Sequence, residues 1–147
     1  MASSDRLTEK WTDTLDEAFG EKGTKGRLGE EFLAKVFDRW GWEYHRNEKD
    51  YKAQIKGRDI EFRKPGWVNF YSADVKNNMN QYGCFYVYKD WLDKVECDRI
   101  FHVNPETGWL AWYSVDKMRE WYDSDVQYIR IIPSNTPNFV TRRKYNG

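Results

Sequence analysis

Residues 58–76 read RDIEFRKPGWVNFYSADVK, two apolar runs joined by Pro65 and Gly66. A Pro-Gly pair between extended segments favours a tight turn, although the proline cannot donate a hydrogen bond to a partner strand. The stretch therefore predicts a β-hairpin, with strands over residues 55–62 and 67–76.

Each strand of this hairpin carries an aspartate, Asp59 on the first and Asp74 on the second. Because side chains alternate between the two faces of a strand, Asp74 and Lys76 project from the same face. Two carboxylates on neighbouring strands, with an ammonium beside one of them, can hold a divalent cation and position a water molecule. The alternative for any one of these residues is an exposed ion pair, which contributes little to stability.

A helix is predicted upstream of the hairpin, beginning at Thr24 or Lys25 and ended by Gly41. Its apolar residues form one broad face when each position advances by about 100°. On this wheel Glu30 falls at the border of the apolar face, whereas Glu31 points away from it. We therefore expect Glu30 to lie along the seam between the helix and the sheet, and Glu31 to be solvated.

The order of the predicted elements implies a mixed sheet with helices packed on it. The other elements are a helix over residues 5–19, strands over 42–46, 99–103, 109–114 and 126–132, short helices over 89–94 and 116–122, and 84–88 as a strand or the start of a helix. At 147 residues the chain is expected to form a single domain over 1–147. Residues 1–22 would be a helical extension and 133–147 a basic, irregular tail.

The composition limits the class of protein. The formal net charge is zero, a third of the residues are charged, and 18% are aromatic. Most aromatic residues are expected in the core, although an excess can stack on nucleic-acid bases. Cys84 and Cys97 fit a reducing compartment, and no apolar stretch approaches the ~18 residues of a membrane span. We expect a cytoplasmic protein, or one made inside a host cell by a phage or mobile element.

Three motifs in order carry a resemblance to a known family. They are KGRLGE over residues 25–30 on a helix, Asp59 on a strand, and Asp-Val-Lys over 74–76 on the next strand. This combination resembles the PD-(D/E)XK nuclease superfamily, which includes restriction enzymes, Holliday-junction resolvases and some homing endonucleases. The helix motif is most similar to the resolvase branch. The resemblance covers about residues 25–90 and implies an α/β, restriction-endonuclease-like core with a central mixed sheet. Arg58 departs from the family, which usually has proline there.

The resemblance and the chemistry of phosphodiester hydrolysis together suggest roles for five residues. Asp59 and Asp74 would bind Mg²⁺, with Mn²⁺ as a substitute, and the resemblance adds the backbone carbonyl of Val75 as a third ligand. Lys76 would position or deprotonate the attacking water and balance charge on the phosphate. Glu30 would bind the metal directly or through water.

Contacts to DNA are expected from basic and amide side chains around these motifs. The candidates are Lys25, Arg27, Arg58, Arg63, Lys64, Asn77, Asn78, Gln81, Arg142, Arg143 and Lys144. Basic side chains would contact phosphates without reading sequence, and the alternative for residues 142–144 is a solvated tail. Cutting two strands requires two sites, so a homodimer is expected, with the first helix and exposed aromatic residues as interface candidates.

The sequence therefore predicts a metal-dependent DNA endonuclease, either structure-specific like a Holliday-junction resolvase or site-specific like a homing or restriction enzyme. Two alternatives stay open: a catalytically silent nucleic-acid-binding or assembly module on the same fold, and a purely structural partner protein. No Gly-rich phosphate-binding motif is present, so no nucleotide cofactor is expected. His45, His102 and the two cysteines lack the spacing of a zinc site.

Overall fold

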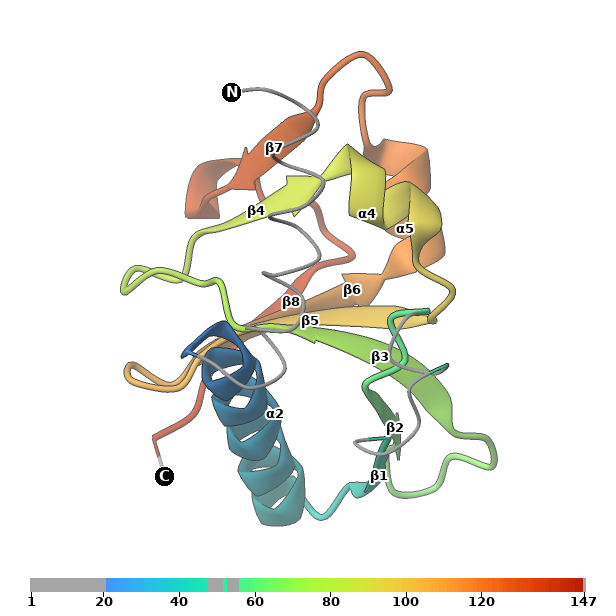
Figure 1. Ribbon diagram of the computed structural model, residues 1–147, viewed down its shortest axis with the longest axis vertical. Helices are drawn as coiled ribbons and strands as arrows, with labels where there is room; N and C mark the ends of the chain where they lie inside the picture. The colour runs from blue at the N-terminus through green and yellow to red at the C-terminus, as the bar shows by residue number, and fades with distance from the viewer. Residues whose placement is uncertain (1–20, 48–51, 53–55, 147) are drawn as a thin grey trace.

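A six-stranded mixed sheet forms the centre of the molecule (Figure 1). The computed structural model describes residues 21–47, 52 and 56–146, so the predicted helix over 5–19 lies outside the described residues. The strands follow the order β1-β2-β3-β5-β6-β8, in which β3 and β5 form a parallel pair. They are β1 (Glu43–Arg46), β2 (Ile60–Arg63), β3 (Tyr71–Lys76), β5 (Arg99–Asn104), β6 (Trp109–Ser114) and β8 (Thr141–Lys144).

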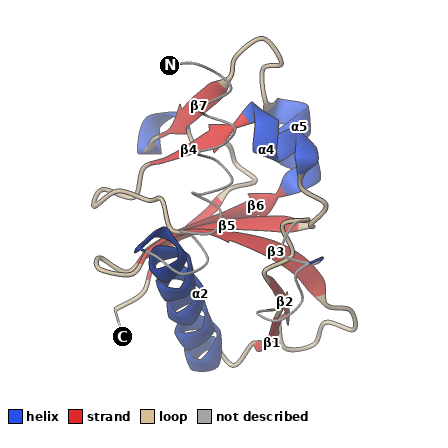
Figure 2. Cartoon of the chain, in the orientation of Figure 1, coloured by secondary structure: helices blue, strands red, loops and turns tan. Residues whose placement is uncertain are grey.

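The long helix α2 (Glu21–Trp40) covers one face of this sheet (Figure 2). Leu33, Val36 and Phe37 of its apolar stripe are fully buried and pack against Phe62 and Phe101 from the strands. The predicted end of the helix before Gly41 is confirmed, and the described part of the helix begins at Glu21, ahead of the predicted start at Thr24 or Lys25.

The other face is covered by a second layer. This layer contains α4 (Lys89–Lys94), α5 (Val115–Trp121), the short 3₁₀ helix η1 (Pro133–Asn135) and a two-stranded sheet of β4 (Phe85–Tyr88) and β7 (Tyr128–Ile131). Ile100 packs into this layer, whereas its neighbour Phe101 packs against α2. This alternation follows from the two-residue period of a strand and divides the core into two clusters.

The predicted hairpin is confirmed, with shorter strands than the sequence suggested. Strands β2 and β3 pair antiparallel, with Ile60 opposite Ala73. Strand β2 begins at Ile60, so the described residues 56–59 precede it, and residues 67–70 lie outside the strands, with a bend at 68–69 before β3. Asp59 therefore lies directly before the strand, and its backbone still bonds to Ala73 on one side and to Asn47 on the other.

The prediction that residues 133–147 form an irregular tail is wrong, because this segment contains a strand of the central sheet. Residues Thr141–Lys144 form β8, which pairs antiparallel with β6, and Val140 just before it is buried. The run of charged residues concealed this strand, because β8 is an edge strand whose backbone pairs with β6 while its side chains remain partly exposed. Within the described residues, no helix is both long and apolar enough to cross a membrane.

Candidate active site

Asp59 and Asp74 come together across the β2–β3 pair. Asp59 donates its backbone amide to the carbonyl of Ala73, and its Oδ2 accepts the amide of Val75 at 2.9 Å. Asp74 is 4% exposed. Burial, the contact with Asp74 and the charges of Asp74 and Glu30 raise the pKa of Asp59 to about 9. Without a divalent cation, the buried Asp74 and the partly buried Asp59 thus retain a proton between them at neutral pH.

Lys76 supplies the positive charge of this cluster. Its Nζ lies 2.9 Å from Oδ2 of Asp74 and 5.2 Å from the ring centre of Trp91. Burial alone would lower the pKa of Lys76, but the charge and contact of Asp74 and the charge of Asp59 outweigh burial and raise it. Lys76 is therefore an ammonium that can orient an oxygen nucleophile and balance phosphate charge, and it is poorly suited to remove a proton.

Glu30 lies at the helix–sheet seam, as its helical phase predicts. Its Oε1 is 3.9 Å from Nη2 of Arg46 on β1, and both side chains are about one-fifth exposed, at 19% and 20%. Glu30 is close enough for its charge to raise the pKa of Asp59. Glu31, one residue further along the helix, is exposed. Arg46 was not identified from the sequence as a site residue, because its pairing across to α2 is set by the tertiary fold.

Arg58, which replaces the usual proline, has a structural partner. Its Nε donates to the carbonyl of Glu96 at 2.8 Å, and the amide of Glu96 donates to the carbonyl of Lys56 at 2.8 Å. Gly57, between Lys56 and Arg58, adopts a φ of +76°, which favours glycine. A Cβ added at this position would lie 3.0 Å from Cγ1 of Val95, so the backbone approaches Val95 closely. These contacts fasten the segment before β2 to the loop after α4, and so position Asp59.

A buried polar chain lies beside Lys76 on the neighbouring strand. His102 is opposite Lys76 in the parallel β3–β5 register and is fully buried. Its Nδ1 is 2.6 Å from Oδ1 of Asn78, and its Nε2 is 2.8 Å from the hydroxyl of Tyr113. Burial, and secondly the charge of Lys76, lower the pKa of His102 well below its usual value. With a neutral ring, Nδ1 donates to Asn78 and Nε2 accepts from Tyr113.

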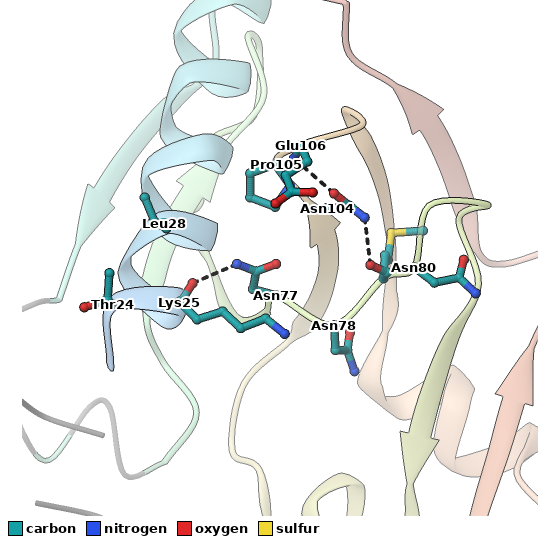
Figure 3. A pocket seen from close by; sticks show the side chains of 10 residues that line it. Thr24, Lys25, Leu28, Asn77, Asn78, Asn80, Asn104, Pro105 and Glu106 are labelled. Atoms are coloured by element: carbon teal, nitrogen blue, oxygen red, sulfur yellow. Dashed lines mark hydrogen bonds between the residues drawn. The ribbon is translucent and has the colours of Figure 1, made fainter. Parts of the chain in front are cut away.

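A cavity of about 550 Å³ opens next to this site (Figure 3). It lies between the start of α2, the loop that follows Lys76 and the β5–β6 turn, and Figure 3 shows Asn77 reaching toward the helix. Asn77 donates to the carbonyl of Lys25 at 2.8 Å. Of the predicted DNA contacts, Lys25, Asn77 and Asn78 line this cavity, and Arg27 is exposed on the same helical turns.

Several other predicted DNA contacts lie away from the carboxylates. Arg63 ends β2 at the opposite end from Asp59 and pairs with Glu43 at 2.7 Å. Lys64 lies 5.0 Å from the ring centre of Trp42 beside the hairpin turn. Residues 142–144 are in β8, which β5 and β6 separate from β3. The predicted gathering of these basic side chains beside Asp59 and Asp74 therefore does not occur. Gln81 is exposed in the loop after β3.

The fold of this chain has counterparts among solved structures. No protein-family model matches the sequence, and no curated protein matches it. Among solved structures, the chain is similar to the bacterial homing endonuclease I-Ssp6803I, with a TM-score of 0.55 and 16% identity over 86% of this chain and 83% of that one. The chain has a restriction-endonuclease-like α/β fold, with helices packed on a mixed six-stranded sheet. It is also similar to Hjc, a Holliday junction resolvase from the hyperthermophilic archaeon Archaeoglobus fulgidus, with a TM-score of 0.49 and 15% identity over 75% of this chain and 85% of that one.

The carboxylate oxygens of Asp59 and Asp74 suit a hard cation. Asp74 Oδ2 is buried and, within the part of the chain that the structure describes, has no hydrogen-bond donor of regular geometry; its contact with Lys76 is an ion pair. A buried carboxylate oxygen in contact with an ammonium, beside a second, proton-bearing carboxylate, fits Mg²⁺, which takes one or two protein carboxylates and keeps several waters. No group of three His, Cys, Asp or Glu side chains is gathered for metal binding among the described residues. Direct ligation thus fits Asp59 and Asp74 better than Glu30.

Proposed function

We propose that this protein is a metal-dependent DNA endonuclease that hydrolyses phosphodiester bonds at Asp59, Asp74 and Lys76. The observation that carries the proposal is the pair formed by the buried Asp74 and the partly buried Asp59, with the ammonium of Lys76 beside Asp74. The pair lies in a fold that is similar to that of a solved homing endonuclease. A structural role for the pair is disfavoured, because a buried carboxylate that retains a proton costs stability.

In this proposal Asp59, Asp74 and the carbonyl of Val75 would hold Mg²⁺, with Mn²⁺ as a substitute. The bound cation would polarise the phosphoryl oxygen and lower the pKa of a bound water. The chain's own residues prepare the site. The amide of Val75 fixes the orientation of Asp59, and the ring of Trp91 holds the Lys76 ammonium from one side. The ammonium orients the attacking oxygen and offsets the charge that develops on the phosphate.

Glu30 and Arg46 would act around this centre rather than in it. The Arg46 guanidinium limits the repulsion that Glu30 exerts on Asp59 and Asp74. Glu30 would then accept a hydrogen bond from a water of the cation, which is the water-mediated form of the role expected from its sequence position. Lys25, Asn77 and Asn78 around the neighbouring cavity would contact the DNA backbone.

The test is cleavage of a panel of DNAs with the purified protein and Mg²⁺, Mn²⁺ or Ca²⁺. The panel contains a four-way junction, a flap, a single strand and a supercoiled plasmid, and the cuts are mapped to the nucleotide. Cuts by the wild-type protein that need Mg²⁺ or Mn²⁺ and disappear in Asp74→Asn are expected. Binding of these DNAs without any cut in either metal would favour the catalytically silent module and overturn the proposal.

The same experiment addresses assembly. Cuts on both strands of a junction or plasmid call for two active sites, so we propose a homodimer. Sedimentation of the protein alone and of its DNA complex gives the number of copies. A single copy that makes paired cuts in one binding event would contradict this part of the proposal.

A further inference from the structure

The outward face of the small sheet is covered by tyrosines. Tyr86 and Tyr88 of β4 and Tyr128 of β7 are 38%, 43% and 58% exposed, and we call these three side chains the tyrosine face. The register places Tyr88 opposite Tyr128 and Tyr86 opposite Arg130. The four outward positions of the two described strands thus hold three phenols and a guanidinium, and none of the four is acidic.

The tyrosine face is continuous with the catalytic lysine. The ring centre of Tyr88 lies 6.3 Å from that of Trp91, whose ring in turn lies 5.2 Å from Nζ of Lys76. On the outward side, Tyr128 lies 6.0 Å from Tyr88 and 5.6 Å from Tyr86. A row of aromatic rings therefore begins at the proposed active site and extends over the sheet. Exposed aromatic residues were expected from the sequence to mark a subunit interface, and this continuity argues for a different occupant.

The chemistry of the row favours nucleobases. Every base has a π-face, and stacking on an aromatic side chain is tolerant of base identity. Side chains two residues apart on a strand are separated by about 6.6 Å, which is close to two base steps of about 3.4 Å. The guanidinium of Arg130 beside the rings can bind a phosphate of the same strand. Reading the major groove of a duplex instead uses several amide and basic side chains, and Arg130 is the single such side chain at these four positions.

We infer that the tyrosine face binds unpaired bases of a DNA strand whose phosphodiester bond lies at Lys76. The inference rests on the proposed nuclease function and names its substrate class: DNA with an unpaired segment next to the cut. Tyr88 is nearest to the site and Tyr128 is the most exposed ring, so these two make the principal stacking contacts.

The test measures binding and cleavage separately. Fluorescence anisotropy with Ca²⁺ in place of Mg²⁺ gives the affinity for a labelled single strand, a fork with unpaired arms and a blunt duplex of the same sequence. The variants are Tyr88→Ala, Tyr128→Ala and Tyr88→Phe, and the control is Phe70→Ala, whose side chain is 43% exposed like Tyr88 but lies on the β2–β3 hairpin connection. Cleavage of the same DNAs with Mg²⁺ is followed in parallel.

Each alanine variant should weaken binding of the single strand and the fork about tenfold, the effect of losing one stacked base, and leave duplex binding within about twofold. Tyr88→Phe and Phe70→Ala should bind like the wild type. Unchanged binding of unpaired DNA, an equal loss on the blunt duplex, or a change of oligomeric mass in the alanine variants would overturn the inference. If the wild-type protein cuts these DNAs while the variants bind and cut normally, the inference alone fails; if the wild-type protein cuts nothing, the nuclease function fails.

A measurement on the unaltered protein guards against misfolded variants. Oligonucleotides carrying 5-iodouracil are photocrosslinked to the wild-type protein, and the attached peptides are identified by mass spectrometry. Crosslinks within Phe85–Tyr88 and Tyr128–Ile131 are expected. Crosslinks confined to other segments would overturn the assignment.

Discussion

The ammonium of Lys76 lies 2.9 Å from Oδ2 of Asp74, an oxygen that is buried and has no regular hydrogen-bond donor among the described residues. The two residues are adjacent positions on one face of β3, so the strand itself sets their separation. The charge of Asp74 raises the pKa of Lys76 and so keeps the lysine charged. We therefore expect that replacing either residue affects the other.

The first prediction concerns this pair. Lys76→Ala should reduce the rate of DNA cleavage at least about 100-fold, because a fixed positive charge at the phosphate is lost. Lys35→Ala, at an exposed position on α2, is the matched control and should cleave like the wild type. Single-turnover cleavage in Mg²⁺ gives the rate, and anisotropy confirms that DNA is still bound. Cleavage by Lys76→Ala at the wild-type rate would remove Lys76 from the mechanism.

The second prediction concerns the shared proton of Asp59. The unfolded chain releases this proton near a pKa of 3.8 and the folded protein near about 9, so the folded state binds one more proton between these values. The stability of the metal-free protein should therefore fall as the pH rises through this window, and the stabilisation by Mg²⁺ should grow, because a cation replaces the proton. Thermal unfolding from about pH 5 to pH 9, with EDTA or with Mg²⁺, measures both trends.

Asp59→Asn serves as the control for this prediction. An amide has no proton to release, so the metal-free variant should lose less stability toward high pH than the wild type. It should also lose most of the stabilisation by Mg²⁺. The same pH dependence in the variant and the wild type would show that another group is responsible.

The third prediction separates two buried tyrosines. The Tyr113 hydroxyl lies 2.8 Å from Nε2 of His102, whereas the Tyr122 hydroxyl has no regular hydrogen-bond partner in the described part of the chain. Tyr113→Phe leaves a buried acceptor on His102 and should lower the free energy of unfolding by about 1–3 kcal/mol. Tyr122→Phe should be neutral or stabilising. Urea unfolding compares the free energies of unfolding of the two variants. Equal losses of stability would contradict the hydrogen bond between Tyr113 and His102.

The fourth prediction uses the two glycines of the helix motif. A Cβ built on Gly29 lies 3.0 Å from Cβ of Asn77 and 3.3 Å from Cγ2 of Val103, whereas one built on Gly26 meets nothing within 4 Å. Gly26→Ala should stabilise the protein by about 0.5–1 kcal/mol through helix propensity. Gly29→Ala should lose this gain and lower cleavage, because α2 must move away from the loop that follows Lys76. Unfolding and cleavage assays on both variants test this prediction. Equal stability and equal cleavage rates in the two variants would contradict the close approach of Gly29 to Asn77 and Val103.

The sequence predicted what local patterns determine. The helical phase of Glu30, the Pro65-Gly66 turn and the alternation of Asp74 and Lys76 each follow from residues within one element. Asp59 was also found, because the hairpin connects it to Asp74 by a short stretch of chain. The fold likeness confirms the mixed α/β, restriction-endonuclease-like architecture that these motifs implied.

Features set by long-range packing were not predicted. Arg46 meets Glu30 only after β1 is placed beside α2, and His102 lies opposite Lys76 because β3 and β5 pair in parallel. Strand β8 gains its hydrogen bonds from β6, so its charged sequence gave no strand signal. The exposure of Tyr88 depends on which face of β4 packs on the core, and the sequence leaves this open because Phe85 and Val87 on one face and Tyr86 and Tyr88 on the other are all suited to burial.

The last prediction tests the two adjacent glutamates. Glu30 is partly buried, pairs with Arg46 and raises the pKa of Asp59, whereas Glu31 is exposed on the other side of the same helical turn. Glu30→Gln should therefore lower the pKa of Asp59 and reduce cleavage about 10-fold or more by disturbing the water around the cation. Glu31→Gln should leave both unchanged, because only the position on the helix differs. The pH dependence of metal-free stability reports the pKa, and single-turnover cleavage reports the rate. If Glu31→Gln matched Glu30→Gln in both assays, general surface charge rather than the placement of Glu30 at the seam would account for its effect.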